Sequence, residues 1–529
     1  MNPVTLFTNK TLVFDSATIN VEQVPLPIPR AQFGILNLTA ISAPSNGITL
    51  DLLFSVDQSG SMSELCSDGR TKMQHITHTL KNMVYYFRDN PHINVFITID
   101  SFDDHIYNIV QRSAITPENL NEIIAKVELI VPKECTNIEA ALIHAERRVQ
   151  QMRADFPSHT ICHVFMTDGV ATTGEQHTDK LTQLVNKNIT SAFIGFGIEH
   201  DGVLLSSLGS GKNSAYYFID QIENAGLVYG EILHGLVYRF VVNVRLTVVN
   251  GYIYDFKNNA WVQELYTDDI VSDSNKTYHI ASHHVEECAI SLTGNRLGEA
   301  SLIHYTIMRD YEVTDLSKFL YRQRTLQHLF AVNTYLKEDN NKNIDDHAGH
   351  RVFAFVTPTA IQPQRPDDYV VLRNKLRDFI KEMKQFMTER QLMNDNFMNN
   401  LCDDIYICYR TFGTKYGTMY ATSRQASQGH QRSYAVSHTP EDVDALRRLA
   451  YPPPPILRRN GAAIRPIGAN IQVDVEEDLD KDMPKHSVSG FNNTPYRTPS
   501  SARVMRALSS GAAAYDSGNE NDEEESQLP

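Results

Sequence analysis

Hydrophobic positions change their spacing several times along this chain, and each spacing predicts a different kind of structure. Residues 1–46 contain two short alternating segments, Thr11–Phe14 and Phe33–Ala40, separated by a proline-rich stretch. Alternation with proline punctuation predicts antiparallel strands. From Ile48 onward, continuous apolar runs alternate with amphipathic stretches, which is typical of buried parallel strands joined by helices. The apolar runs are Leu50–Val56, Ile93–Ile99, Ile161–Met166 and Ile189–Phe196, and the amphipathic stretches are Lys72–Phe87, Ile138–Met152 and Asp179–Val185.

The α/β segment is predicted to cover residues 48–222. After it, hydrophobic and polar residues alternate again. Residues 236–310 contain further alternating runs, beginning with Phe240–Val248, and turn signals such as Asn250-Gly251. This pattern predicts a β-sandwich or a small β-domain. We expect the strands of residues 1–46 to join it, because the α/β domain is then inserted in a β-domain whose two pieces lie close together.

A helical region is predicted for residues 311–411, with helices over 316–338 and over 367–409. Apolar residues in the second helix recur at intervals of three and four, which places them on one stripe. They are Leu372, Leu376, Phe379, Met383, Phe386 and Met387. We expect this stripe to pack within the chain's own fold, and the alternative is self-association through the two helices.

Residues 412–529 are predicted to be mostly disordered. The stretches 416–430 and 492–518 are rich in small and polar residues, and such a composition buries too little apolar surface to offset chain entropy. Residues 500–510 are the exception, because they can form a short basic helix. We regard this helix as a candidate partner-binding segment.

Composition excludes several classes of protein. The 529 residues carry 48 Lys and Arg against 63 Asp and Glu, a net charge of −15, which argues against a general surface for nucleic acid or for anionic membranes. No stretch approaches the ~18 apolar residues of a membrane span, and Met1–Phe14 lacks the features of a secretory signal. The 6 cysteines have no zinc-like pairing. We therefore expect a cytoplasmic or other intracellular protein, and a virion location if the chain is viral.

Candidate metal chemistry lies at the ends of three predicted strands. Asp57-Gln58-Ser59-Gly60-Ser61 follows the run Leu50–Val56 directly, Thr136 precedes the amphipathic stretch from Ile138, and Asp168 follows the run ending at Met166. Loops at the carboxyl ends of parallel strands converge on one crevice where the strand order reverses. Hard carboxylate and hydroxyl oxygens suit Mg²⁺, which favours octahedral geometry and keeps several waters. The structural alternative is that Asp57 only caps the first helix and that Asp168 only caps a turn.

These motifs resemble those of the von Willebrand factor A domain family over about residues 48–222. Five residues match the metal-ion-dependent adhesion site of that family: Asp57, Ser59, Ser61, Thr136 and Asp168. The resemblance implies that the serine hydroxyls bind Mg²⁺, or Mn²⁺ or Ca²⁺, that Thr136 binds it directly or through water, and that the two aspartates hold coordinated waters. It also implies one open coordination position for a carboxylate of a partner.

Other chemistry fits the sequence less well. An aspartate after a buried strand is also the nucleophile position of haloacid-dehalogenase-type phosphatases, but Ser59 stands where their second acid is expected. Gly209-Ser210-Gly211-Lys212-Asn213 departs from a Walker A loop at two positions, so we predict an ordinary loop before a strand at 215–219. His75 and His78 are spaced for a metal pair on a helix, although a solvated face is the preferred interpretation.

Three functional hypotheses follow from these observations. The leading one is a non-enzymatic interaction module whose Mg²⁺ captures an Asp or Glu carboxylate of a protein partner. The second is a Mg²⁺-dependent hydrolase or phosphotransferase that uses the same crevice. The third is an assembly scaffold in which the metal site is vestigial or purely stabilising.

Overall fold

The computed structural model divides into two compact units, and each is described by itself. The described residues are 6–15, 31–43, 47–66, 68–133, 135–197, 199–219, 225–299, 302–311, 315–346, 366–433 and 495–510. The first unit holds the described residues up to 330, together with 422–433 and 495–510, and the second holds those from 331 to 421. Across these residues, none of the helices combines the length and the apolar character that crossing a bilayer requires.

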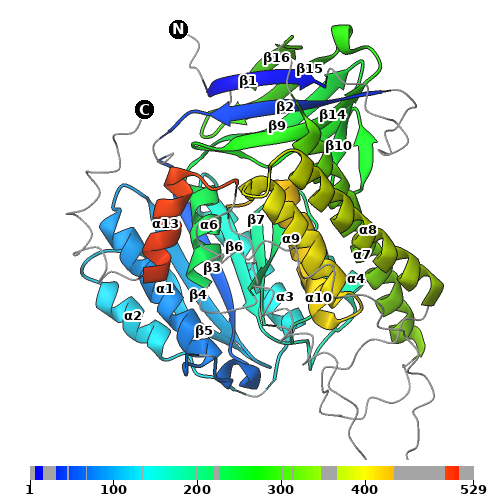
Figure 1. The fold of residues 1–529 in the computed structure, drawn as a ribbon. Coiled ribbons are helices and arrows are strands. Elements are labelled where there is room, and N and C mark those ends of the chain that lie inside the picture. The colour runs from blue at the N-terminus through cyan, green and yellow to red at the C-terminus, as the bar shows by residue number, and fades with distance from the viewer. Residues whose placement is uncertain are drawn as a thin grey trace, which may run out of the picture. The chain divides into compact units, whose positions relative to one another are not determined.

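A 6-stranded sheet forms the centre of the α/β domain, in the order β5-β4-β3-β6-β7-β8 (Figure 1). Its strands are β3 (Leu50–Asp57), β4 (Val95–Phe102), β5 (Ile106–Ala114), β6 (Thr160–Thr167), β7 (Thr190–Phe196) and β8 (Ser214–Ile219). β3 pairs in parallel with β4 on one side and with β6 on the other, so the strand order reverses at β3. The carboxyl ends of β3 and β6 therefore flank the position where such sheets bind ligands.

This sheet confirms the predicted doubly wound α/β fold, with one addition. β5 was not predicted, and it pairs antiparallel with β4 at the edge of the sheet. Only the turn Asp103–His105 separates the two strands, which is too short for the crossover that a parallel pair requires.

The helices of the α/β domain begin at residues that position the candidate site. They are α1 (Lys72–Asp89), α2 (Leu120–Glu128), α3 (Ile138–Asp155), α4 (Thr178–Thr182), α5 (Gly202–Leu208) and α6 (Ala225–Val237). A capping box starts α1, because the Gln74 backbone N–H donates to Thr71 Oγ1 at 3.1 Å and the Thr71 N–H donates to Gln74 Oε1 at 2.8 Å. Asn137 caps α3 by accepting from the Ala140 N–H at 2.9 Å. These caps fix the residues on either side of the carboxyl edge.

Two antiparallel sheets form the β-domain, and strands from both sides of the α/β domain contribute to it. The first sheet has the order β1-β2-β14-β10-β11, and the second has the order β12-β9-β15-β16 with β13 beside β9. The strands are β1 (Phe7–Phe14), β2 (Gln32–Ala40), β9 (Arg239–Val249), β10 (Tyr252–Asp255), β11 (Ala260–Val262), β12 (Glu264–Tyr266), β13 (Ile270–Val271), β14 (Asn275–Ser282), β15 (Ala289–Arg296) and β16 (Leu302–Met308). β2 pairs with β14, and inward side chains of both sheets, including Leu36, Leu246 and Ile280, share one core. The prediction that the amino-terminal strands join the later β-domain is confirmed.

The helices after the β-domain differ from the predicted ones at a break near residue 391. They are α7 (Ser317–Asp346), α8 (Pro366–Glu389), α9 (Asn396–Thr411) and α10 (Lys415–His430). The single helix predicted over 367–409 is wrong, because the chain takes a left-handed conformation at Gln391 (φ 57°) and Asp395 caps a new helix through the Met398 N–H at 3.0 Å. The apolar stripe of α8 is buried at Leu376 and Met383. Self-association through these helices stays a prediction.

Two helices lie in the segment that was predicted to be mostly disordered. α10 covers all of 416–430, where Tyr416, Met419 and Tyr420 are buried. α13 (Pro499–Ser510) packs along α6 and contacts α1 (Figure 1). The prediction of disorder is therefore wrong for 416–430, whereas the short helix considered for 500–510 is present. A few apolar residues at helical spacing suffice for a helix once a partner surface covers them. Residues 434–494 and 511–529 of the segment lie outside the described residues.

Close backbone packing holds α13 against α6. A β-carbon at Gly226 would lie 2.7 Å from the Leu508 carbonyl oxygen, and one at Gly230 would lie 2.5 Å from Met505 Cα. Asn82 Nδ2 of α1 donates to the Leu508 carbonyl at 2.9 Å, which holds the end of α13. The segment 500–510, considered as a partner-binding helix, thus has its binding surface within the same chain.

Replacing Gly230 with alanine should push α13 away from α6, because the new methyl group would overlap the Met505 backbone. We expect a loss of about 1–3 kcal/mol in the free energy of unfolding and faster proteolysis of residues 495–510. Gly235→Ala is the matched control on the same helix, since no atom lies within 4 Å of its β-carbon position. The control should be neutral or stabilising by up to ~1 kcal/mol. Equal behaviour of the two variants in chemical unfolding would contradict the packing.

Candidate functional site

Asp57 occupies the last position of β3, at the centre of the carboxyl edge. Its side chain is fully buried, and Oδ1 accepts the Ser59 backbone N–H at 2.7 Å. The Thr167 hydroxyl, at the end of β6, donates to the other carboxylate oxygen. Because β3 and β6 are parallel neighbours, these two strand ends meet and fix the Asp57 carboxylate in one orientation.

The two serines of the motif extend the site from the turn after β3. Ser61 lies in a short 3-10 helix, Gly60–Ser63, which brings its Oγ to 3.1 Å from Ser59 Oγ. Ser61 Oγ also donates to Asp168 Oδ1 at 2.6 Å. The turn after β3 and the turn after β6 are thereby joined through side-chain oxygens.

Thr136 reaches the same place from the loop before α3. Its backbone N–H donates to Thr172 Oγ1 at 2.9 Å, which anchors this loop to the segment after β6. A β-carbon at Gly169 would lie 3.5 Å from Thr136 Oγ1 and 3.7 Å from Ser61 Oγ, so both hydroxyls border the space left by this glycine. The structure thus brings all five predicted site residues together at one edge of the sheet.

The electrostatics of this group favour a cation. Asp57 and Asp168 are both fully buried. Burial, with a further contribution from the Asp168 carboxylate, raises the pKa of Asp57 to about 7, although hydrogen bonds from Thr167 and Ser59 oppose the rise. Two buried carboxylates side by side are costly, and a divalent ion relieves both the burial and the repulsion.

The donor set fits a hard divalent metal ion. It offers hydroxyl and carboxylate oxygens only, with no thiolate or imidazole among the five residues. Mg²⁺ prefers such oxygens at ~2.0–2.1 Å and retains waters where the protein supplies few ligands. Ser59, Ser61 and Thr136 would supply hydroxyls, while Asp57 and Asp168 would supply charge and hold waters.

Lys72 is a site residue that the sequence analysis missed. Its Nζ lies 2.7 Å from Asp168 Oδ2 and 2.6 Å from Glu64 Oε2, and its side chain is 13% exposed. Burial lowers the pKa of Lys72, but the two carboxylates outweigh it and hold the pKa above its usual value. A positive charge thus pairs with one of the two aspartates at the candidate metal position. The available signal was the place of Lys72 at the first position of a capped helix.

Replacing Lys72 with methionine should strengthen the binding of divalent cations. The ammonium group neutralises Asp168 and repels an incoming cation, so its removal should lower the Mg²⁺ dissociation constant by about tenfold or more. Isothermal titration at pH 7.5 measures this constant. Lys81→Met is the control, because Lys81 lies on the same helix and pairs with Glu128 at 2.7 Å, away from the site. Unchanged or weaker binding in Lys72→Met would contradict the assigned role.

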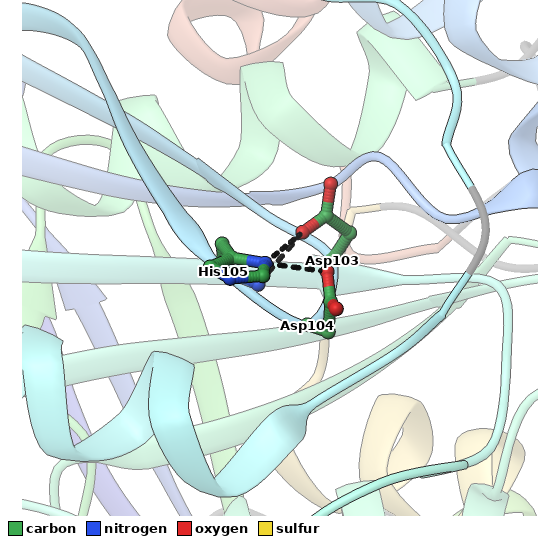
Figure 2. A group of neighbouring side chains, drawn as sticks. All are labelled: Asp103, Asp104 and His105. Atoms are coloured by element: carbon green, nitrogen blue, oxygen red, sulfur yellow. Dashed lines mark hydrogen bonds and ion pairs between the residues drawn. The ribbon is translucent and has the colours of Figure 1, made fainter.

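A second group of possible ligands lies in the turn between β4 and β5. Figure 2 shows His105 facing Asp103 and Asp104, with His105 Nδ1 at 2.8 Å from Asp104 Oδ1. Asp103 Oδ1 accepts the His105 backbone N–H at 2.7 Å, and Oδ2 accepts Gln58 Nε2 at 2.9 Å. These bonds account for Asp103 as a turn-forming residue, so the group gives no reason to assign a metal there.

The histidine pair considered from sequence does not converge on a shared ligand position. His75 Nε2 lies 3.1 Å from Asp68 Oδ1, whereas His78 Nε2 lies 3.1 Å from Asn82 Nδ2. The loop Gly209–Asn213 connects α5 to β8, as predicted.

Comparisons with known proteins agree with this fold. The family model of the von Willebrand factor type A domain matches residues 51–229. Inter-alpha-trypsin inhibitor heavy chain H3 of Rattus norvegicus is 24% identical over 345 residues, which cover 60% of this chain and 37% of that protein. The chain therefore spans well under half the length of this relative.

Solved structures give weaker similarities. A von Willebrand factor type A protein from Catenulispora acidiphila matches with a TM-score of 0.43 and 14% identity, covering 65% of this chain and 84% of that one. Proximal thread matrix protein 1 from the mussel byssus, solved with a zinc-occupied MIDAS motif, matches with a TM-score of 0.31 and 16% identity, covering 40% of this chain and 52% of that one.

The doubly wound sheet, the Asp-x-Ser-x-Ser turn after its central strand and the family match all refer to the same segment. Domains of this family are typically metal-dependent adhesion or protein-interaction modules. The chain therefore contains a von Willebrand factor type A domain at residues 51–229.

Proposed function

We propose that this chain is a non-enzymatic interaction protein that captures an acidic side chain of a protein partner through a divalent cation, Mg²⁺ by preference. The observation that carries the proposal is the convergence of Asp57, Ser59, Ser61, Thr136 and Asp168 at the carboxyl edge of the sheet. The matching family model supports it, because domains of that family generally bind protein ligands.

The charge balance of the site explains why a carboxylate is the expected ligand. The five residues offer two negative charges, and Lys72 neutralises part of that charge at Asp168. A bound Mg²⁺ would thus keep a net attraction for an anion, and a hard carboxylate oxygen from a partner is the best match for its remaining position. A neutral amide of the same shape lacks that charge.

Selection of random peptides on the immobilised full chain in Mg²⁺, with elution by EDTA, tests this proposal. We expect the eluted peptides to share an Asp or Glu, and replacement of that acid by Asn or Gln should weaken binding by at least about tenfold. Asp57→Ala should yield no EDTA-eluted peptides. Recovery of peptides without an acidic residue, or of peptides that resist EDTA, would refute the proposal.

A further inference from the structure

A cavity of about 340 Å³ lies in the first unit, away from the carboxyl edge of the α/β sheet. Strands β10, β12 and β14 of the β-domain, the first part of α7 and the end of α10 line it. Its volume is within the ~300–1,000 Å³ range of small-molecule sites in proteins. The position raises the question of which ligand chemistry the lining side chains favour.

Arg322 supplies a buried positive charge without an acidic partner. The residue is 2% exposed and lines the cavity from α7. Its Nη1 donates to the Thr277 carbonyl at 3.1 Å and its Nη2 donates to the Gln428 carbonyl at 2.6 Å, while Nε has no hydrogen-bond partner among the described residues. Burying a guanidinium with only neutral acceptors is costly, because its charge remains uncompensated.

Two lysines add to this positive charge. The Lys276 ammonium donates to the His430 carbonyl, and burial lowers the pKa of Lys276, although nearby carboxylates oppose this. Lys212, from the loop before β8, lies at the cavity with its Nζ 4.5 Å from the centre of the Tyr266 ring. Within the described parts of the chain, neither lysine has a carboxylate oxygen within 4.0 Å.

The acidic side chains around the cavity are already engaged. Asp268 accepts from His430 Nδ1 at 2.5 Å. Asp255 accepts the Lys257 backbone N–H at 2.9 Å within its own turn, and Glu264 pairs with Arg245 at 3.5 Å. None of these interactions satisfies Arg322, so the guanidinium retains capacity for an external anion.

Aromatic side chains form the walls beside these cations. Tyr254, Phe256, Tyr266 and Tyr278 line the cavity, together with Leu265 and Leu326. Apolar and aromatic walls with a few charged groups are typical of sites for small organic ligands. This combination favours a flat apolar body that carries one anionic group.

We propose that this cavity binds a small organic anion, with a carboxylate or phosphate on Arg322 and Lys276 and an aromatic or similarly flat body against the tyrosine and phenylalanine walls. The site is separate from the metal-dependent function proposed for the carboxyl edge. It uses no residue of that edge.

Phenyl phosphate is the probe, benzyl alcohol is its uncharged counterpart, and both are measured by isothermal titration on the full chain in EDTA. EDTA removes any metal at Asp57, so anion binding there does not contribute. We expect saturable binding of phenyl phosphate and no saturable binding of benzyl alcohol. Arg322→Met should weaken the binding of phenyl phosphate by at least about tenfold, and Arg322→Lys by less.

Arg324→Met is the matched control, because it removes a positive charge from the same helix at a residue that does not line the cavity. Its dissociation constant for phenyl phosphate should equal that of the wild-type chain. Lys276→Met provides a second test in case Arg322→Met fails to fold, and it should weaken binding by a few-fold or more. Wild-type affinity for phenyl phosphate in both cavity variants, equally tight binding of benzyl alcohol, or no binding of phenyl phosphate at millimolar concentration would each overturn the proposal.

Discussion

Replacing Asp57 with asparagine should weaken Mg²⁺ binding by at least about 100-fold while the domain remains folded. Asparagine keeps the shape of the side chain and an oxygen that accepts the Ser59 N–H, but it removes one of the two buried negative charges. The remaining carboxylate, Asp168, is already paired with Lys72 at 2.7 Å. The variant therefore retains little attraction for a divalent cation.

Isothermal titration with Mg²⁺ at pH 7.5 measures this loss, and thermal unfolding in EDTA reports on the fold. Because burial raises the pKa of Asp57 to about 7, the ionised carboxyl destabilises the metal-free fold near neutral pH, so the neutral side chain should leave the metal-free protein at least as stable as the wild-type chain. Asp104→Asn is the control, since it removes an exposed carboxylate from the other candidate cluster. Equal Mg²⁺ affinity of Asp57→Asn and the wild-type chain would contradict the site.

Acidification should destabilise the folded chain by several kcal/mol between pH 7 and pH 4, because histidines are buried in the neutral form. Burial lowers the pKa of His163, His234 and His430 to about 4, and it lowers the pKa of His279 as well. The unfolded chain therefore binds more protons than the folded chain between the ordinary value of 6.5 and the folded value. The stability from each histidine is present above pH 6.5 and is lost as the pH falls toward 4.

A comparison of the wild-type chain with His163→Gln isolates one of these contributions. His163 Nε2 lies 2.9 Å from Ser55 Oγ in the core of the sheet, so the variant should be less stable at pH 7.5. The stability gap should shrink by about 2–3 kcal/mol at pH 4.5, because only the wild-type chain pays the cost of the buried histidine. Asp57, whose raised pKa has the opposite effect on stability, is present in both proteins and cancels.

Urea unfolding followed by far-ultraviolet circular dichroism, in EDTA over a series of pH values, gives the gap. His92→Gln, which makes the same substitution at an exposed histidine outside the core, is the control for the effect of the substitution itself. A gap for His163→Gln that is constant from pH 7.5 to pH 4.5 would show that His163 is not held neutral in the fold.

The candidate site was predictable because two of its oxygen-bearing residues directly follow predicted strands. Asp57 and Asp168 each follow a continuous apolar run, and parallel strands necessarily bring such positions to one edge. Lys72 was not predictable in the same way. Its approach to Asp168 depends on the capping box that starts α1, which fixes the position of the first helical residue.

The outer parts of the fold show where sequence patterns lose information. α13 contains few apolar residues, and its helical structure depends on a groove beside α6 in which Gly226 and Gly230 leave room for its backbone. Composition averaged over the segment cannot report such a partner surface, because the two glycines lie far away in the sequence. The break between α8 and α9 similarly depends on the left-handed conformation at Gln391.

Diffraction from crystals grown with Mn²⁺, recorded at the manganese absorption edge, tests the central claim most directly. We predict an anomalous peak at ~2.1–2.2 Å from the hydroxyl oxygens of Ser59 and Ser61, with Asp57 and Asp168 facing it. A peak at Asp103–His105 instead, or no peak while Lys72 keeps its contact with Asp168, would contradict the account.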